Sequence, residues 1–405
     1  MSERASNRPT APGVLRHWGS HFKSPRQVAH WRGLFAPLLA HGWRTGLVLE
    51  RRPENSAWTA ELERDGVEIF CVPRPRGQFD RACVRAVREL CARFSADVFH
   101  CENIHTSPML GAWLARVPVR IWQKHSMFRH HEESRPPTWK ERLAPSTRLT
   151  CALATRVLAV SHSVAGELQA SGFAQGKILV RNNPRTAGPE SPAPDRAETR
   201  QQLGWSENEI VFVTIGQALP VKGWDVLFES FATVEKTFPS ARLLFVGSHS
   251  GAEEKRLHEK LLARRAALGL VEKVHFTGHV ADIAPALRAA DVFVMPSRAE
   301  GFSHALIEAL EHGRPCVATR TGIAPEVIED GRNGILVERN DAPSLARALL
   351  ALAGSSAQRE EFARRAVVPA SIPTLAGYAE QLCCDYTALL AGQSAPVEIR
   401  PAVAT

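Results

Sequence analysis

Short apolar runs alternate with longer amphipathic stretches along the whole chain. An apolar run of roughly four to eight residues bounded by turn residues is typical of a buried strand, whereas apolar residues at every third or fourth position predict a helix. In the first half the expected strands are Gly13–Trp18, Thr45–Glu50, Val67–Val72, Asp97–His100, Val119–Trp122 and Arg156–Val160. The expected helices cover Pro25–Ala40 and Asp80–Phe94, and a third begins at Ser161 or Ser163.

The same alternation continues in the second half, where it is clearer. Strands are expected at Glu209–Ile215, Ala241–Val246, Lys273–Phe276, Val292–Met295, around Val317 and at Ile335–Val337, and Glu326–Glu329 continues the alternation. Helices are expected over Trp224–Phe238, 252–267, Ile283–Ala290, 343–353, 358–366 and 373–391. Repeated strand–helix units with short apolar strands predict parallel sheets that are covered by helices on both faces.

The length of the chain, 405 residues, exceeds what one typical core accommodates and predicts two domains. We expect an α/β protein with two doubly wound domains over 13–185 and 199–370, facing a cleft. A segment rich in Pro, Ala and acidic residues predicts a linker over 186–198. The ends, 1–12 and 393–405, are expected to be a disordered start and a tail. The helix within 371–392 either stays with the second domain or returns to the first, and the sequence does not decide which.

Charge is distributed unevenly along the chain. The formal net charge is +8, and it divides into +13 over residues 1–185 and −5 over the remainder. Seven of the nine tryptophans also lie in the first part. One interpretation is an arginine-rich, solvated surface, and the other is a domain that meets an anionic lipid or membrane surface. No nucleic-acid partner is expected, because nothing resembles a nucleic-acid-binding signature.

Compartment is predicted from the cysteines and the start of the chain. The eight cysteines form no Cys-x-x-Cys pair, and the polar start MSERASNRPTAPG lacks the apolar core of a signal peptide. No run of eighteen apolar residues indicates a membrane-spanning helix. We therefore expect reduced thiols and a cytoplasmic protein. Whether it also binds peripherally to the inner face of the plasma membrane stays open.

Two glutamates, Glu300 and Glu308, stand eight positions apart in PSRAEGFSHALIEALEHGRPCVAT, residues 296–319. A helix rises ~1.5 Å per residue, so eight residues span at most ~12 Å, which exceeds the ~5–9.5 Å of glycosidase carboxyl pairs. Between them Gly301, Phe302 and Ser303 begin a helix whose free N–H groups suit an anion such as phosphate. A sugar nucleotide has the matching shape. Charge on a helix surface is the alternative, and for Glu308 alone it stays equally open.

The ordered block from Asp291 to Val337 carries a family resemblance. It reads DVFVMPSRAEGFSHALIEALEHGRPCVAT and then TGIAPEVIEDGRNGILV. This block resembles the second domain of retaining GT-B-type glycosyltransferases of glycosyltransferase family 4 (glycosyl transferases group 1), whose signature is a Glu-x7-Glu pair in this setting. The resemblance extends over about 209–366 and, more loosely, over 85–185. It implies two Rossmann-like domains, with the donor on the second and the acceptor on the first.

The resemblance implies roles for residues of the second domain. It places Glu308 at the ribose hydroxyls of the donor and Glu300 beside the transferred sugar. The segment GQALPVKG, residues 216–223, resembles a family pattern in which an arginine and a lysine clamp the donor diphosphate. Lys222 matches that lysine. Gln217, after Gly216, replaces the arginine and adds no positive charge. The nucleobase loop falls on His279 and Val280.

The first domain matches the family less closely. His125 corresponds to a family histidine near the transferred sugar, and a structural imidazole is the equal alternative. The Gly-rich phosphate loop is reduced here to Gly19-Ser20. The stretch Arg129–Glu133 is interpreted as a polar loop rather than a metal site, because its spacing matches no standard ligand set. No metal or other cofactor is expected beyond the nucleotide-sugar co-substrate. Asn182-Asn183 and Ile323 replace residues common in the family.

The expected function is transfer of a hexosyl or N-acetylhexosaminyl group from a nucleoside diphosphate sugar to a hydroxyl of a saccharide or lipid-linked acceptor, with retained anomeric configuration. By analogy with the family it belongs to bacterial envelope or surface polysaccharide biosynthesis, lipopolysaccharide included. Three alternatives stay open: a phosphorylase or an epimerase of the same fold, and a binding scaffold without turnover, which Gln217 favours. Base, sugar, acceptor and oligomeric state are beyond the sequence.

Overall fold

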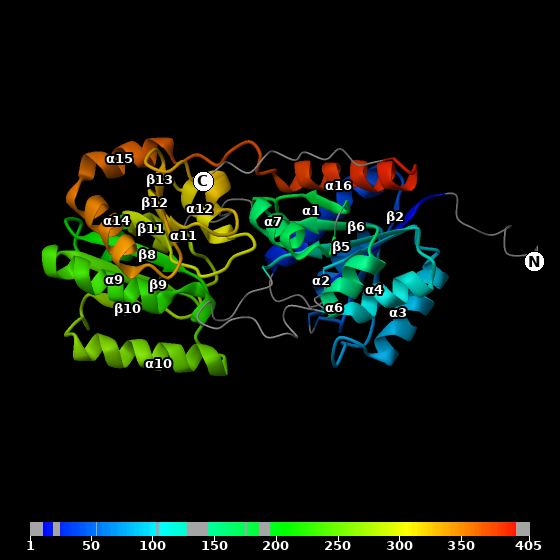
Figure 1. Cartoon of the computed structure of the whole chain (residues 1–405), viewed down its shortest axis with the longest axis horizontal. Helices are drawn as coiled ribbons and strands as arrows, with labels where there is room; N and C mark the ends of the chain where they lie inside the picture. Colours follow the sequence, from blue (N-terminus) through cyan, green and yellow to red (C-terminus); the bar gives the residue numbers. More distant parts are fainter. Residues whose placement is uncertain are drawn as a thin grey trace, which may run out of the picture. The chain divides into compact units, whose positions relative to one another are not determined.

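The structure is a computed structural model that describes residues 11–18, 25–53, 55–102, 105–127, 145–174, 176–185 and 195–393. These residues form two compact units (Figure 1). The first unit contains the described residues up to His125, those of 145–184 and those from Pro373 onward, and the second contains residues 126 and 127 and those of 185–372. Each unit is described by itself below.

The first unit is built on a seven-stranded sheet with the order β3-β2-β1-β4-β5-β6-β7. Every pairing in it is parallel. Its strands are β1 Gly13–His17, β2 Arg44–Leu49, β3 Val67–Cys71, β4 Val98–Cys101, β5 Val119–Lys124, β6 Arg156–Ala159 and β7 Ile178–Val180. Its helices are α1 Pro25–Ala40, α2 Ser56–Arg64, α3 Arg81–Phe94, α4 Thr106–Leu114, α6 Pro145–Leu153, α7 His162–Ser171 and α16 Leu375–Leu390.

The second unit is built on a six-stranded parallel sheet with the order β10-β9-β8-β11-β12-β13. Its strands are β8 Ile210–Ile215, β9 Ala241–Val246, β10 Val274–Phe276, β11 Val292–Met295, β12 Cys316–Thr319 and β13 Gly334–Val337. Its helices are α8 Arg196–Gln202, η1 Pro220–Lys222, α9 Trp224–Thr237, α10 Ala252–Ala267, α11 Ala284–Ala289, α12 His304–Glu311, α13 Ala324–Val327, α14 Ala342–Gly354 and α15 Ser356–Arg365. Two parallel sheets with covering helices confirm the predicted fold class.

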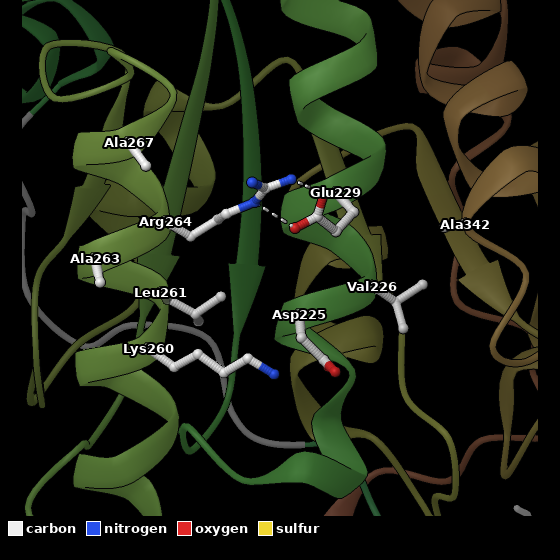
Figure 2. A pocket seen from close by; sticks show the side chains of 9 residues that line it. All are labelled: Asp225, Val226, Glu229, Lys260, Leu261, Ala263, Arg264, Ala267 and Ala342. Atoms are coloured by element: carbon white, nitrogen blue, oxygen red, sulfur yellow. Dashed lines mark hydrogen bonds and ion pairs between the residues drawn. The ribbon is translucent and has the colours of Figure 1, made fainter.

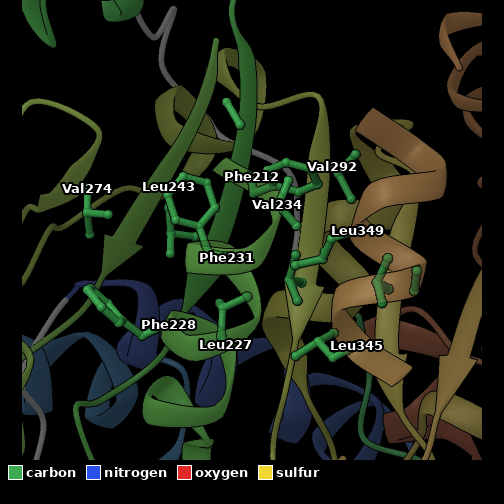
Figure 3. Packing of buried hydrophobic residues seen from close by; sticks show 14 of the residues in the cluster. Phe212, Leu227, Phe228, Phe231, Val234, Leu243, Val274, Val292, Leu345 and Leu349 are labelled. Carbon is green, nitrogen blue, oxygen red and sulfur yellow. The ribbon is translucent and has the colours of Figure 1, made fainter. Parts of the chain in front are cut away.

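Apolar faces of helices close the core of each sheet. In the second unit Figure 3 shows Phe228 and Phe231 of α9 and Leu345 and Leu349 of α14 packed beside the strands. Phe231 is fully buried, and its ring meets that of Phe212 from β8 edge-on at a centroid distance of 6.5 Å. Burying one such side chain contributes about 1.5–3 kcal/mol, so these contacts hold the strand ends in fixed positions.

The strand order reverses once in each sheet, and ligands of doubly wound folds bind at the carboxyl ends of the strands at that point. In the first unit the reversal lies between β1 and β4, and in the second between β8 and β11. The residues that follow β8 and β11 are the two stretches singled out in the sequence, 216–223 and 296–303. Topology alone therefore brings both stretches to one edge of the second sheet.

The last helix packs on the first unit, which answers the question that the sequence left open. Helix α16 lies along α1 and also contacts β5 (Figure 1, in red). Its buried side chains Tyr378, Leu382 and Tyr386 share one hydrophobic cluster with Trp31 and Phe35 of α1. The C-terminal segment thereby completes the core of the domain that the N-terminus begins.

Two predicted boundaries are wrong. The predicted linker 186–198 ends too late, because Asp195 caps α8 by accepting a hydrogen bond from the main-chain N–H of Glu198 at 2.7 Å. Arg196 and Arg200 both pair with Asp291, which anchors α8 to the second unit. The element expected at Glu326–Glu329 is the short helix α13, and it begins and ends two residues earlier, covering Ala324–Val327.

Within the described part of the chain, no helix combines the length and apolar character that crossing a membrane requires.

Candidate active site

The loop after β11 leads into α12 and exposes main-chain donors. Ser303 is the N-cap of α12, and its hydroxyl accepts a hydrogen bond from the N–H of Leu306 at 3.3 Å. The N–H groups of Gly301, Phe302 and Ser303 have no acceptor among the described residues. Free N–H groups at a helix start carry partial positive charge, so the loop is suited to an anion.

Lys222 and Glu300 form an ion pair at this edge of the sheet. The Nζ of Lys222, at the end of η1, donates to Oε1 of Glu300 at 2.6 Å. The hydroxyl of Ser297 donates to the same oxygen at 2.8 Å, and only 8% of Glu300 is exposed. The pair connects the loop after β8 with the loop after β11, two segments that are 78 residues apart in sequence.

Two glycines lie against these residues, and Gly322 permits the close approach to Glu300. Gly322 has a φ of +58°, and a Cβ there would lie 2.7 Å from the Cβ of Glu300. A Cβ on Gly216 would rest against the aliphatic part of Lys222, with its Cδ at 3.5 Å. Residues with side chains rarely adopt the left-handed conformation of Gly322, so the chain around Glu300 depends on glycine there.

Gln217, the residue that stands where the family has an arginine, is held by a carboxylate. Its Nε2 donates to Oε1 of Glu254, near the start of α10, at 3.0 Å. The other oxygen of Glu254 accepts hydrogen bonds from the hydroxyl of Ser248 and the N–H of Gly251, at 2.9 and 3.1 Å. The hydrogen bond from Gly251 is the main cause that lowers the pKa of Glu254. This corner of the site therefore carries negative charge.

The predicted nucleobase loop lies beside the end of β9. The N–H of Gly247 donates to the carbonyl of Gly278 at 3.0 Å, and the N–H of Gly216 donates to the carbonyl of Val246 at 2.9 Å. His279, which is exposed, and the half-buried Val280 follow directly. The loops after β8, β9 and β10 are thus connected side by side at one edge of the sheet.

Glu308 lies inside α12, one turn after His304. It is half-buried, and its main-chain oxygen accepts a hydrogen bond from the N–H of His312 at 3.0 Å. Burial raises the pKa of the neighbouring Glu311, and the charge of Glu308 adds to that rise. His304 itself is exposed, with its ring 5.0 Å from that of Phe302.

In the first unit, His125 follows directly after β5. Its Nε2 lies 3.2 Å from Oε2 of Glu102, the residue after β4, and 39% of its side chain is exposed. Asn182 and Asn183 also belong to this unit: Asn182 donates to the carbonyl of Val160 at 3.1 Å, and Gln123 donates to Oδ1 of Asn183 at 3.3 Å. Gly19 and the stretch predicted as a polar loop over 129–133 lie outside the described residues.

Two family descriptions match most of the chain. "Glycosyl transferases group 1" matches residues 195–367, and "Glycosyl transferase 4-like domain" matches residues 27–184. The chain belongs to the glycosyl transferases group 1. The family predicted from the sequence is thereby confirmed.

The chain is also similar to individual proteins and solved structures. A 200-residue segment of this group 1 glycosyltransferase is 33% identical to D-inositol 3-phosphate glycosyltransferase from Nocardia farcinica, over 48% of this chain and 44% of that protein. The chain therefore spans less than half the length of that curated relative. Among solved structures, HepE from Anabaena in complex with UDP and glucose has a TM-score of 0.73 at 20% identity, over 93% of this chain and all of that one. WaaG, described as a glycosyltransferase involved in lipopolysaccharide biosynthesis, has a TM-score of 0.67 at 17% identity, covering 92% and 99%.

Sequence reasoning did not single out several residues that the structure of this glycosyltransferase places in contact with the predicted ones. Ser297 and Thr321 both contact Glu300: the hydroxyl of Thr321 accepts a hydrogen bond from the N–H of Glu300 at 3.2 Å. Glu254 holds Gln217, and Glu102 meets His125. Glu102 had one available signal, its position two residues past His100 at the end of a predicted strand.

A groove of about 580 Å³ lies elsewhere on the second unit, between α9 and α10. Figure 2 shows Arg264 of α10 reaching across it to Glu229 of α9, with N–O distances of 2.9 and 3.1 Å. Helix side chains line this groove, whereas the predicted site is formed by loops after strands. Asp225, which lines the groove, also pairs with Arg298 from the loop after β11 at 2.8 Å.

Proposed function

We propose that the chain is a retaining glycosyltransferase that moves a sugar from a nucleoside diphosphate sugar to a hydroxyl of a saccharide or lipid-linked acceptor. The observation that carries the proposal is the Lys222–Glu300 ion pair beside the unpaired N–H groups of Gly301, Phe302 and Ser303. Cation and free donors together form an anion site, and the carboxylate adds an acceptor for sugar hydroxyls.

Donor binding changes the partner of Lys222. A diphosphate carries more negative charge than one carboxylate, so it draws the ammonium group away from Glu300. Oε1 of Glu300 then keeps the hydrogen bond from Ser297 and regains a lone pair that can accept from a hydroxyl of the transferred sugar. Glu308 takes the ribose hydroxyls, and the loop at His279 and Val280 meets the base through its main chain.

The chemistry that we propose uses the leaving group as the base. The bond between the anomeric carbon and the phosphate oxygen breaks, and the acceptor oxygen bonds to that carbon on the same face. The proton of the acceptor passes to the departing phosphate, so no protein nucleophile is needed. Lys222, the amides after Glu300 and Gln217 stabilise the negative charge that grows on the phosphate. In the first unit, His125 is proposed to meet the substrate.

The surface of the first unit supports a lipid-linked acceptor. Arg81, Arg85 and Arg88 of α3 are exposed and, spaced four and three residues apart, form one stripe. On α4, which packs along α3, Trp113 and Leu114 are 49% and 40% exposed. Basic and apolar side chains together favour a phosphorylated lipid at an anionic membrane. This surface and the likeness to WaaG support a role in envelope polysaccharide biosynthesis on the inner face of the plasma membrane.

A second candidate, a nucleotide-sugar-binding scaffold without turnover, is favoured by one observation. Gln217 turns its amide toward the carboxylate of Glu254 rather than presenting a cation to the site. Stabilisation of the leaving group then rests on Lys222 and the main-chain amides. A scaffold of this kind binds the donor but releases no nucleotide.

A donor screen distinguishes these functions. Uridine, guanosine and adenosine diphosphate sugars are offered with lipid-linked and saccharide acceptors, and released nucleotide and product are measured beside binding by calorimetry. Acceptor-dependent nucleotide release that Lys222→Ala abolishes supports the transferase. Tight binding without release supports the scaffold. A crystal complex with the nucleotide bound away from Lys222 and α12 overturns both.

A further inference from the structure

Three neighbouring strands of the first sheet bring Arg16, Glu102 and His125 together at its carboxyl edge. Arg16 on β1 is 2% exposed and pairs with Oε1 of Glu102. The other oxygen of Glu102 lies 3.2 Å from Nε2 of His125. Exposure of the side chains increases along the series, with 2% for Arg16, 12% for Glu102 and 39% for His125. His125, the most exposed of the three, is therefore in contact with the less exposed Glu102, which in turn pairs with the buried Arg16.

The charge of Glu102 decides which nitrogen of His125 carries the proton. Burial alone would raise the pKa of Glu102, but the charge of Arg16 and the hydrogen bond from His125 lower it well below its ordinary value. An ionised carboxylate only accepts hydrogen bonds, so Nε2 of His125 must donate. Nδ1 is then the nitrogen that a neutral ring offers to a substrate. Among the described residues, further charged or titratable groups around this ring include Arg16, His30 and His100.

The C-terminal helix supports Arg16 through a directional chain of hydrogen bonds. Nη1 of Arg16 donates to the hydroxyl of Tyr386 at 3.2 Å, and that hydroxyl lies 2.6 Å from Nδ1 of His100. Nε2 of His100 meets the amide oxygen of Gln123 at 2.8 Å, so this nitrogen donates. Tyr386 must therefore donate to Nδ1, and its oxygen is free to accept from Arg16. Burial lowers the pKa of His100 well below its ordinary value, which keeps the ring neutral as this chain requires.

We propose that Glu102 is a positioning residue of the transfer reaction, which fixes the ring and the tautomer of His125 and is itself held by Arg16 and Tyr386. The inference rests on the proposed function, because it takes His125 as a group that meets the substrate. Glu102 touches His125 and not the reacting atoms, so its contribution is orientation. An outer partner of this kind commonly changes activity by roughly 10–100-fold when it is removed.

The test combines kinetics with nitrogen NMR on the full chain. Glu102→Gln keeps the size of the side chain and an oxygen for Arg16, but it no longer forces Nε2 of His125 to donate. Long-range ¹H–¹⁵N spectra, with the His125 signals assigned by their loss in His125→Gln, are expected to show the proton on Nε2 in the natural chain and a mixture of tautomers in Glu102→Gln. The kcat is expected to fall roughly 10–100-fold while the KM of the donor stays within about twofold.

Two matched variants on α16 complete the design. Tyr386→Phe removes the acceptor of Arg16 and is expected to change the His125 signals in the same direction. Tyr378→Phe removes a hydroxyl that contacts Gln123 at 3.0 Å instead, and is expected to change neither the signals nor kcat. Should Glu102→Gln not fold, Glu102→Asp tests the contact by distance instead, because its shorter side chain withdraws the carboxylate from Nε2 of His125. Melting temperatures check each variant.

The possible outcomes distinguish failure of the role of Glu102 from failure of the proposed glycosyltransferase function. Unchanged His125 tautomers in Glu102→Gln overturn the positioning role, whatever the activity. Changed tautomers with unchanged kcat overturn its part in the reaction. If the natural chain transfers no sugar, the proposed function fails, and with it the catalytic part of the inference, while the NMR result still decides whether Glu102 orients the ring.

Discussion

The ammonium group of Lys222 has two proposed partners at the candidate site, Glu300 and the donor diphosphate. In the structure Lys222 neutralises Glu300, a carboxylate that is 8% exposed, and in the proposed reaction it moves to the donor diphosphate. Glu300 is mostly buried, so leaving its carboxylate without a partner would be costly. In the proposed reaction, the donor and Glu300 therefore compete for the same ammonium group.

The two glutamates of the signature are expected to fail in different ways. Glu300→Ala removes the group beside the transferred sugar, so kcat should fall roughly 100-fold with little change in the Kd of the nucleotide. Glu308→Ala removes the ribose contact, so Kd should rise roughly 10-fold, as expected for a lost hydrogen bond to a charged group. Initial rates and calorimetry measure both. Kinetics like those of the natural chain for both variants would contradict the assignment.

Helix α16 is joined to the first sheet by a buried ion pair as well as by apolar contacts. Arg181, just after β7, donates to both carboxylate oxygens of Asp385 at 2.8 Å. The exposed fractions of these side chains are 4% and 3%. Removing one partner of a buried pair leaves the other charge without compensation inside the protein.

Asp385→Asn is therefore expected to lower the free energy of unfolding of the first unit by about 3–5 kcal/mol. Urea unfolding followed by tryptophan fluorescence measures the change, because most tryptophans lie in this unit. The matched control on the same helix is Glu380→Gln, whose partner His41 lies 3.4 Å away, with both side chains more than half exposed. The control should change stability by less than about 1 kcal/mol. Equal effects of the two substitutions would show that α16 is held by its apolar face alone.

Sequence patterns located most elements, and the reasons for the misses are physical. The helix over Ala252–Ala267 and the strand Val292–Met295 have clear periods and were predicted with the observed bounds. Helix α4 was missed because TSPMLGAWL is apolar on all sides and shows no helical period. The predicted positions of Lys222 and Glu300 meet in space, but the roles of Glu102 and Glu254 depend on contacts across 23 and 37 residues of chain. Local patterns carry no record of such contacts.

The first unit as a whole is expected to lose stability in mild acid. Burial lowers the pKa of His17 to about 4, and burial likewise holds His100 neutral. The unfolded chain takes up protons near pH 6.5, whereas the folded chain does so only near pH 4, so stability is present above the unfolded pKa and is lost as pH falls through this window. Both ring nitrogens of His17 lack partners among the described residues, so the ring gains nothing that offsets this loss.

Between pH 7.5 and pH 5, His17 alone should account for roughly 2 kcal/mol of lost unfolding free energy. His17→Leu, similar in size and uncharged, should reduce the loss over this range by that amount. Urea unfolding at both pH values measures it. An identical pH dependence in the natural chain and the variant would show that other groups cause the loss.

The charge asymmetry of the whole chain makes a prediction about membranes. Each arginine near an anionic bilayer contributes about 1 kcal/mol, so the triple substitution of Arg81, Arg85 and Arg88 by glutamine should weaken binding to phosphatidylglycerol vesicles roughly 100-fold. Binding to the natural chain should also weaken as salt rises. Vesicle flotation measures both. Lys255, Arg256 and Lys260 on α10 give a control with the same change in net charge, and equal weakening there would leave total charge as the only cause.

The return of α16 to the first sheet also sets an order of events at the ribosome. The partners that Arg16, His100, Gln123 and Arg181 find on this helix leave the exit tunnel only after the entire second unit has been translated. The domain that is translated first is therefore completed last, and until translation ends Arg16 lacks the hydroxyl of Tyr386 and Arg181 lacks Asp385. A premature stop codon just before Pro373 would release a chain whose later half is complete and whose earlier half cannot close.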